Sequence, residues 1–308
     1  MKAISAKFGI KKIKSFKAFK EGHQNTNYLI DTGKKKFVLQ VLEQTTVKKA
    51  KRLAQLLVYL EKNRFKTSKV INSKPQKAIK LWKKKPLMLK KYIKGNVHKD
   101  LSPNVLRSIG KELALLHQVK PPKKLPKMPD YGVERFAEIK KYARDSKFDL
   151  YLQEIKDYIE PYLKQDLPKA LIHGDLFWNN VIVNKQKNKV VIMDFENSAY
   201  YYRVYDIGMA FVGICSEGQS INLKKARYLL EGYQSEIQLS KKELHALKAF
   251  TIYAAASMAF WRHRYFNYYS PDPKMKKHYL GLKVLADFMS QQKDSCFTKI
   301  HKTSGKKK

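Results

Sequence analysis

A polar loop between apolar strands constrains this chain more than any other feature. Residues 171–180 read LIHGDLFWNN, and residues 191–196 read VIMDFE. The apolar runs predict a buried strand before the loop and a short hairpin after it. The loop holds Asp175 and Asn180 five residues apart, and the hairpin returns the chain to Asp194. We therefore expect three oxygen-bearing side chains to gather beside a buried sheet.

Two acids and an amide in this arrangement are typical of phosphoryl transfer. One Asp accepts the proton of an alcohol, while an Asn and a second Asp hold the Mg²⁺ that bridges the nucleotide phosphates. Mg²⁺ prefers oxygen ligands, and an anionic transition state needs positioning and charge neutralisation. Asp and Asn are also common in turns, so each residue alone says little. The whole pattern H-x-D-x(4)-N, flanked by apolar strands and followed by D-F, favours the catalytic interpretation.

The segment resembles the catalytic core of the aminoglycoside phosphotransferase and choline kinase superfamily, the small-molecule relatives of protein kinases. The resemblance implies that Asp175 is the catalytic base and that Asn180 and Asp194 bind the metal. It also implies supporting roles for His173, which would brace the loop, and for Asp206, which opens the next helix. The cofactors implied are ATP and Mg²⁺. The fold implied is α+β and two-lobed, with a small antiparallel-sheet N-lobe and a larger, mainly helical C-lobe.

Within that superfamily, the chain is most similar to bacterial homoserine kinase of the phosphotransferase type. The matching stretches are QNTNYLI at 24–30, KFVLQ at 36–40, LF at 176–177, AFWR at 259–262 and PDP at 271–273. The similarity implies phosphorylation of L-homoserine to O-phospho-L-homoserine, a step of threonine biosynthesis. Glu196 departs from it, because those kinases tend to have an aromatic residue after Asp-Phe. Choline, ethanolamine, sugar and aminoglycoside kinases therefore remain alternatives.

The composition bounds the class of protein. A chain of 308 residues that is 44% hydrophobic can bury a full core. It has neither an apolar run of membrane-spanning length nor a secretory signal, and two cysteines suit a reducing compartment. We expect a cytoplasmic protein with an N-lobe at 1–93, a C-lobe at 94–295 and a disordered basic tail at 296–308. The oligomeric state is left open.

The charge of the chain is strongly positive. Lys and Arg number 64 against 26 acids, which gives a net charge of +38. A basic nucleic-acid-binding protein, or a kinase-like fold without catalysis, is the alternative from another functional class. The Lys clusters are dispersed, however, and Arg, the better reader of bases, is scarce. We expect a solvated basic surface, a small hydroxyl compound as substrate, and no specific nucleic acid or membrane partner.

The first ninety residues predict a sheet with one helix. Strands are expected near 13–19, 27–31, 36–42, 67–71, 78–81 and 86–93, with a helix over 47–60. The stretch 89–95 would be the hinge between the lobes. The adenine would rest there, against Leu89 and Tyr92.

The phosphate-binding elements of this region are unusual. No G-x-G-x-x-G motif occurs, and residues 22–27 occupy the equivalent hairpin. Gly22, Asn25 and Asn27 are candidate phosphate contacts, although an ordinary polar turn would look the same. Gln40 stands where the strand Lys of a kinase is expected, and the helix offers only Glu61 as the usual partner. Either another cation or the metal must do the work of that Lys.

The remainder of the chain predicts helices around the catalytic segment. They are expected at 103–117, 133–146, 150–164, 206–215, 223–235, 241–267 and 274–291. His117 would be a helix-end residue without a catalytic role. In the superfamily, the C-terminal helices supply the acceptor pocket.

Candidate pocket residues follow from this location, although aromatic stripes more often pack in a core. Arg262 or Arg264 could hold the carboxylate of an amino acid through a bidentate pair. Glu196 with Tyr202 and its neighbours could instead form a box for a quaternary amine. Trp261 is a further candidate, and the sequence leaves the two pockets open.

Overall fold

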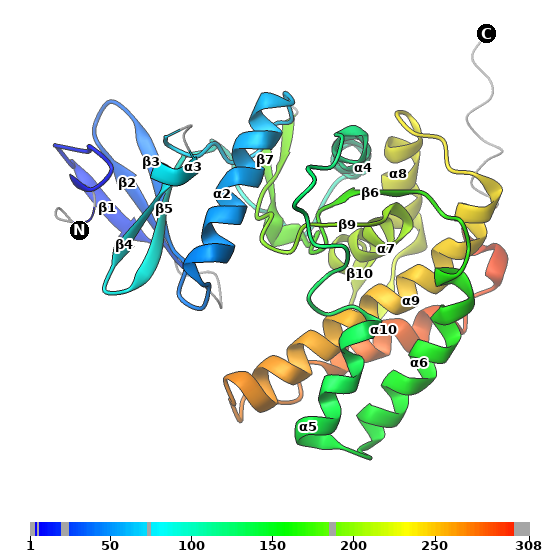
Figure 1. Ribbon diagram of the computed structural model, residues 1–308. Helices are drawn as coiled ribbons and strands as arrows, with labels where there is room; N and C mark the ends of the chain where they lie inside the picture. Colours follow the sequence, from blue (N-terminus) through cyan, green and yellow to red (C-terminus); the bar gives the residue numbers. More distant parts are fainter. Residues whose placement is uncertain (1–3, 5, 20–24, 73–74, 185–188, 299–308) are drawn as a thin grey trace, which may run out of the picture. The chain divides into compact units, whose positions relative to one another are not determined.

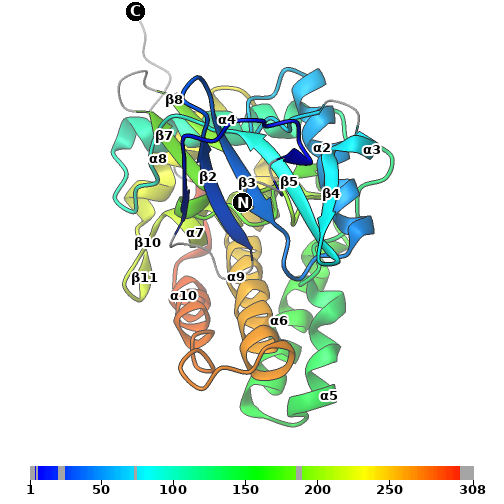
Figure 2. The ribbon, with the colours of Figure 1, turned by 90° about the vertical axis from the view of Figure 1, so that its left-hand side faces the viewer.

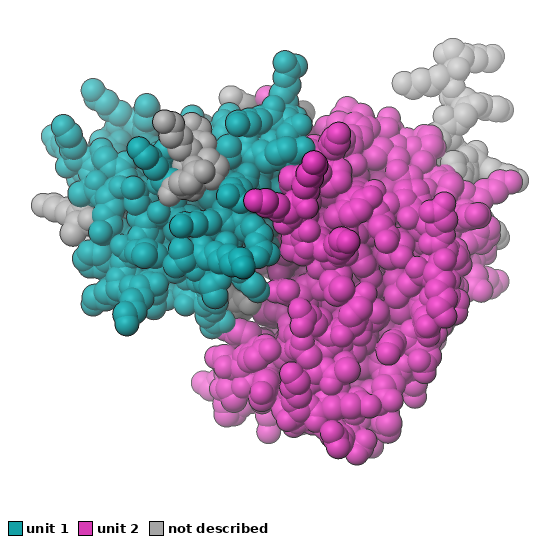
Figure 3. Space-filling view, in the orientation of Figure 1, with its two compact units in different colours: residues 1–96, 193–196 teal, residues 97–192, 197–308 magenta. Residues whose placement is uncertain are grey.

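The chain forms two compact units, coloured separately in Figure 3. The structure, a computed structural model, describes all residues except 1–3, 5, 20–24, 73–74, 185–188 and 299–308. Unit 1 comprises Met1–Asn96 together with Met193–Glu196, and unit 2 comprises Val97–Ile192 and Asn197–Lys308. Unit 1 is built on an antiparallel sheet and unit 2 is mainly helical (Figure 1). The predicted α+β class is therefore confirmed.

Unit 1 is organised by a five-stranded antiparallel sheet. The strand order is β1-β2-β3-β5-β4, formed by Ser15–Ala18, Thr26–Asp31, Lys36–Val41, Lys85–Lys91 and Ile79–Trp82. Figure 2 labels the last four of these strands in that order. One face buries a cluster of Ile30, Leu39, Leu87 and Leu89. Since side chains alternate across a strand, Gln40 points to the opposite face. The register pairs Gln40 with Asn27 on β2 and Met88 on β5.

Helix α2 (Val47–Lys62) packs against β4 and β5 and begins at an N-cap, Thr46. A short helix, α3 (Pro75–Ala78), leads into β4. The strand predicted at 67–71 is wrong, because Val70 forms only a single bridge, with Lys90. The reason is that β4 already pairs with residues 85–88 of β5. Only the last residues of that edge remain available for pairing.

Unit 2 contains the loop 173–180 and most of the helices. The α-helices are α4 (Pro103–Gln118), α5 (Lys140–Ala143), α6 (Lys147–Leu163), α7 (Arg203–Ile214), α8 (Leu223–Gln234), α9 (Lys241–Arg264) and α10 (Leu280–Ser290). The strands are β6 (Lys169–Ile172), β7 (Val181–Asn184), β8 (Lys189–Ile192), β9 (Ala199–Tyr202), β10 (Ser216–Glu217) and β11 (Ser220–Ile221). Short helical turns are η1 (Val133–Ile139), η2 (Trp178–Asn180), η4 (Tyr265–Tyr269) and η5 (Asp294–Cys296).

Two predicted helices of unit 2 differ in the structure. The segment 133–146 begins as the 3-10 helix η1, because its buried residues Val133, Phe136 and Ile139 recur every three residues, the period of that helix. The helix predicted to start at Lys274 starts at Leu280 instead. The residues before it, KMKKHY, are mostly charged or polar, and only Met275 and Tyr279 among them are partly buried, which is too little apolar surface to favour a helix there.

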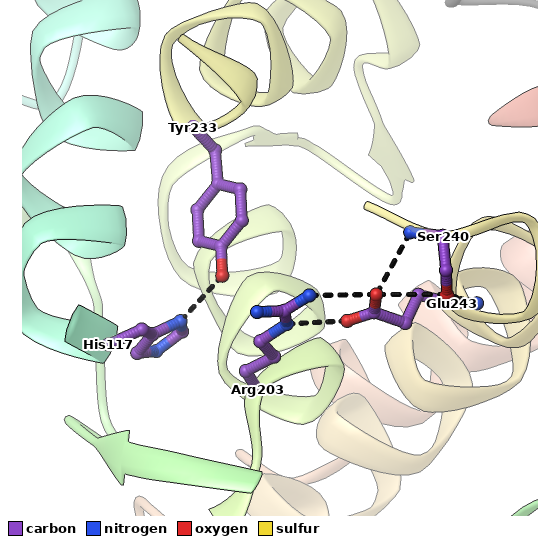
Figure 4. Close-up of polar contacts among 5 residues, drawn as sticks. All are labelled: His117, Arg203, Tyr233, Ser240 and Glu243. Carbon is purple, nitrogen blue, oxygen red and sulfur yellow. Dashed lines mark hydrogen bonds and ion pairs between the residues drawn. The ribbon is translucent and has the colours of Figure 1, made fainter. Parts of the chain in front are cut away.

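Helix α9 is the central element of unit 2 and is buried along most of its length. Its start is fixed by a fully buried carboxylate, Glu243, shown in Figure 4. Glu243 accepts two hydrogen bonds from the guanidinium of Arg203 on α7 and one from the backbone N–H of Ser240. Such a bidentate pair fixes distance and angle together. The contact therefore joins the first turns of α7 and α9.

Helices α4 and α8 touch backbone to backbone. A Cβ atom on Gly110 of α4 would lie 1.9 Å from the carbonyl oxygen of Leu229, and one on Gly232 of α8 would lie 1.9 Å from that of Arg107. Both distances are far below any real contact, so each helix presents a glycine to the other. The two helix axes can come this close only because neither position carries a side chain.

In the part of the chain that the structure covers, no helix has both the length and the apolar composition of a bilayer span. Within the predicted tail, Phe297 is buried and stacks on Phe211 of α7. Residues 299–308 of that tail lie outside the described residues.

We expect a buried histidine to make the stability of unit 2 sensitive to acid. His263 of α9 packs among the rings of Phe148 and Tyr279, and burial lowers its pKa from 6.5 to about 4. Between those values the unfolded chain binds a proton that the folded chain does not, so stability falls as the pH falls from 6.5 towards 4. We expect a loss on the order of 1 kcal/mol at pH 5, after allowing for solvent screening.

The measurement is the free energy of unfolding in urea at pH 7 and at pH 5. The variant His263→Phe should lose less stability between the two values than the wild type. His245→Gln, at an exposed position of the same helix, should behave as the wild type. An equal acid sensitivity of all three proteins would contradict the assignment.

Candidate active site

The loop 173–180, which carries Asp175 and Asn180, lies in unit 2 between two pairs of strands. Strand β6 pairs antiparallel with β9, so that Ile172 faces Ala199. Strands β7 and β8 form the predicted hairpin, with Val181 opposite Ile192. The loop 173–180 connects β6 to β7. The local reading of this segment as strand, loop and hairpin is therefore confirmed.

The beginning of the loop is held by the carboxylate of Asp206 on α7. Asp206 is fully buried and accepts the backbone N–H groups of His173, at 2.7 Å, and Gly174, at 2.8 Å. Burial raises the pKa of Asp206, but hydrogen bonds and the charge of His117 outweigh that effect and lower the pKa below its ordinary value. Asp206 thus remains ionised and fixes the loop backbone, which is the geometry that a supporting role requires. His173 in turn accepts the backbone N–H of Asp175 through Nδ1.

Two residues without a predicted role complete this support. His117 of α4 is buried, with Nε2 at 3.1 Å from Asp206 and Nδ1 at 2.9 Å from the hydroxyl of Tyr233 on α8 (Figure 4 shows the second contact). Tyr131 donates its hydroxyl hydrogen to the carbonyl oxygen of Gly174. Burial raises the pKa of Tyr131 far above its usual value, and the nearby Asp175 acts in the same direction, so the hydroxyl stays a donor.

A hydrogen bond connects Asp175 and Asn180, the two predicted active residues of the loop. Asn180 is buried, and its side-chain Nδ2 donates to the carbonyl oxygen of Asp175 at 2.8 Å. This bond fixes the orientation of the amide and leaves Oδ1 of Asn180 as the atom able to bind a cation. The carboxylate of Asp175 accepts a further bond from Asn197, at 3.2 Å.

Asp194 belongs to unit 1, within the segment Met193–Glu196. Its backbone has φ of 69°, the left-handed region that a residue with a Cβ seldom adopts. Asp adopts this region more readily than most residues with a Cβ, and backbone outliers of this kind cluster at functional sites. Phe195, the next residue, anchors the segment in unit 1 by packing edge-on against Phe65.

Glu196 lies in unit 1 as well, where it accepts hydrogen bonds from two predicted nucleotide-binding residues. Asn25 donates to Oε1 of Glu196 at 2.8 Å, and Gln40 donates to the same oxygen at 3.1 Å. The amide of Gln40, at the position of the expected strand Lys, is therefore paired with a carboxylate from far along the chain. Glu61, the predicted partner for that position, instead forms an ion pair with Lys69.

The other predicted nucleotide-binding residues are distributed over the same unit. Asn27 is the cross-strand neighbour of Gln40. The side chain of Leu89 is fully buried in the core cluster. Tyr92 follows β5 and donates its backbone N–H to Lys36. Gly22 lies outside the described residues.

The predicted acceptor residues of unit 2 separate into two groups. Trp261 stacks on Tyr265, and Tyr202 donates its hydroxyl hydrogen to the carbonyl oxygen of Leu163. Arg264 is buried and pairs with Glu138 at 2.8 Å. These three side chains have structural partners.

Arg262 differs from them. It is half-buried, its guanidinium lies over the ring of Phe177 in the catalytic loop, and no acid of the described residues forms an ion pair with it. Burial lowers the pKa of Arg262, while the negative charge of Asp175 acts in the opposite direction. Arg262 is thus an arginine near the predicted base that remains available for an anion.

The donor set for a metal contains one predicted carboxylate ligand and one amide. Among the described residues, no group of three His, Cys, Asp or Glu side chains could hold a metal ion. Asn180 Oδ1 and the carboxylate of Asp194 are oxygen ligands, which suit Mg²⁺, an ion that keeps most of its ligands as water and phosphate.

The comparisons with known proteins agree with the motif. A family model described as the phosphotransferase enzyme family matches residues 15–239. A homoserine kinase of Paramagnetospirillum magneticum is 26% identical over 257 residues, which cover 79% of this chain and 79% of that protein. A homoserine kinase of Agrobacterium fabrum is 26% identical over 253 residues, which cover 78% and 77%.

Solved structures show the same fold. An amicoumacin kinase in complex with AMP-PNP and Ca²⁺ has a TM-score of 0.72 at 13% identity, covering 95% of this chain and 94% of that one. A choline/ethanolamine kinase family protein from Mesorhizobium loti has a TM-score of 0.71 at 13% identity, covering 97% and 99%. At these identities, the likeness concerns the fold.

Proposed function

Because this chain belongs to the phosphotransferase enzyme family, we propose that it transfers the γ-phosphoryl group of ATP to the hydroxyl of L-homoserine. The products would be ADP and O-phospho-L-homoserine. The observation that carries the choice of acceptor is Arg262, an arginine near Asp175 without an acidic partner among the described residues. The relatives named homoserine kinase support the same choice.

In this proposal, Asp175 is the general base. Its carboxylate accepts a hydrogen bond from the substrate hydroxyl and takes the proton as the oxygen attacks the γ-phosphorus. Its backbone is held on both sides, by His173 through the N–H and by Asn180 through the carbonyl. Such support keeps the reacting oxygen in line, which is how positioning contributes to the rate.

Asn180 Oδ1 and Asp194 would hold Mg²⁺. The ion, when bound, neutralises charge on the β- and γ-phosphates. Chain connectivity supports this pair, since Asn180 directly precedes β7 while Asp194 follows the end of β8 by two residues, and β7 pairs with β8. The left-handed backbone of Asp194 fits a residue retained for function at a cost in stability.

Arg262 would bind the carboxylate of the amino acid. A guanidinium that is removed from water without a counter-ion is costly, and a substrate anion offsets that cost. Arg264 has such a counter-ion already in Glu138, so it is not needed for this role. The fork of donors on Arg262 matches the two oxygens of a carboxylate.

A pocket for choline would need an acid beside an aromatic box. The acid expected there, Glu196, accepts hydrogen bonds from Asn25 and Gln40 in unit 1. The ring of Tyr202 is buried, and Nζ of Lys169 already lies 4.6 Å from its centroid. These contacts favour the carboxylate-bearing acceptor over the quaternary amine.

The direct test is an acceptor panel with the purified full-length chain, ATP and Mg²⁺. The panel contains L-homoserine, choline, ethanolamine, glucosamine, kanamycin and 3-aminopropan-1-ol, which has the hydroxyl and amine of homoserine without its carboxylate. We expect kcat/KM for L-homoserine to exceed that of every other acceptor by about 100-fold or more, the value of a well-formed charged pair. Release of ADP, with mass spectrometry of the product, measures it.

A preference for an acceptor without a carboxylate would overturn the proposal for homoserine, and the better acceptor would identify the subgroup. Phosphoryl transfer to none of them, together with tight and steeply salt-dependent binding of RNA or DNA, would favour the non-catalytic alternative.

A further inference from the structure

Asn197 is in contact with the predicted base, although neither the sequence pattern nor the family resemblance gives it a role. Its Nδ2 lies 3.2 Å from Oδ2 of Asp175, and both residues belong to unit 2. The amide group can only donate from that nitrogen, and an ionised carboxylate can only accept. The contact is therefore a charge-assisted hydrogen bond to one oxygen of the base.

The backbone brings these two residues together. Strands β6 and β9 are paired antiparallel, and Ile172 faces Ala199 at the end of the pair. The residues that follow Ile172 therefore lie beside the residues that precede Ala199. Gly174 has φ of +83°, and a Cβ atom there would lie 2.5 Å from the backbone oxygen of Asn197. The segment that carries Asn197 thus lies directly against the residue before Asp175.

The residue on the other side of Asn197 within unit 2 is also packed. Ser198 is buried, and the next residue, Ala199, is paired with Ile172. The backbone on both sides of the contact is therefore held by the β6–β9 pair, which reduces the entropic cost of presenting the amide of Asn197 to Asp175.

We propose that Asn197 is a positioning residue that orients the carboxylate of Asp175 for proton transfer. The proposal rests on the function proposed above. By holding Oδ2, the amide limits rotation of the carboxylate about its Cβ–Cγ bond. Asn197 acts through the base and does not itself contact the reacting atoms.

The first experiment measures kcat and KM of Asn197→Ala and of Asn197→Asp, which has the same shape but a carboxylate in place of the donor. We expect kcat to fall about 10-fold in the alanine variant and about 100-fold in the aspartate variant, because a like charge repels the base. KM for ATP and for the alcohol should change less than about 3-fold, because no ground-state contact is removed. Ser198→Ala, at the neighbouring buried residue, is the matched control and should keep the wild-type kcat.

The second experiment is a double-mutant cycle with Asp175→Asn, followed both with the alcohol and with water as acceptor in slow ATP hydrolysis. In the Asp175→Asn background, Asn197→Ala should change kcat less than about 2-fold, because its effect passes through the missing base. An equal loss in both backgrounds, or a wild-type kcat for both Asn197 variants, would overturn the positioning role. A wild-type kcat for Asp175→Asn alone would instead refute the proposed base.

Discussion

Asp175→Asn should lower kcat by about 10³-fold, and by at least 10²-fold, because general base catalysis contributes about 10²–10⁴. The asparagine keeps the shape of the side chain but cannot take a proton. The bonds of the loop backbone to Asp206, His173 and Asn180 do not involve the side chain of residue 175. The fold and the affinity for ATP should therefore stay close to those of the wild type.

The measurements are kcat with the best acceptor of the panel, Kd for ATP by calorimetry and the midpoint of thermal unfolding. Asp166→Asn, which removes an equal charge from an exposed loop of the same unit, is the control and should be fully active. If Asp175→Asn retained more than a tenth of the wild-type kcat, Asp175 would not be the base.

Arg262→Met should lower kcat/KM for L-homoserine by about 100-fold, because loss of a desolvated charged contact costs about 2–5 kcal/mol. The methionine preserves much of the apolar stem of the arginine and removes the guanidinium. Activity with 3-aminopropan-1-ol should change less than about 3-fold, since that acceptor has no carboxylate to lose. Arg262→Lys should lie between, because it keeps the charge without the fork of donors.

The ratio of kcat/KM for the two acceptors is the decisive quantity, because it is insensitive to the amount of folded enzyme. Arg264→Met provides a nearby comparison. It leaves Glu138 without its partner, so it should lower the thermal midpoint but leave the ratio unchanged. If this ratio changed in Arg264→Met and not in Arg262→Met, the substrate carboxylate would bind Arg264, and the proposal for Arg262 would be wrong.

The sequence reveals local features of this protein well. The loop with Asp175 and Asn180 and the β7–β8 hairpin are visible because strand, loop and turn are all set within some twenty residues. The α4 helix is likewise predicted, from Pro103 at its start and its apolar spacing. In each case the residues that determine the structure are neighbours along the chain.

Contacts between residues far apart along the chain could not be predicted from the sequence. Glu196 bonds to Gln40 across 156 positions, and His117 to Asp206 across 89. Neither pair leaves a periodic pattern, and His117 on its own resembles any residue at the end of a helix. The strand expected at 67–71 fails for a related reason. The apolar residues of 67–71 predict a strand. However, β4 already pairs with most of that edge of β5, so only Val70 forms a bridge, with Lys90.

The close contact between α4 and α8 at two glycines also affects the support of the loop that carries Asp175. Tyr233 directly follows Gly232, and its hydroxyl meets His117, whose ring reaches the carboxylate that secures the loop amides. A methyl group at Gly110 or Gly232 would push helices α4 and α8 apart. The hydroxyl of Tyr233 would then move away from the imidazole of His117. Any side chain at these two positions would therefore disturb the support of the loop from the far side of unit 2.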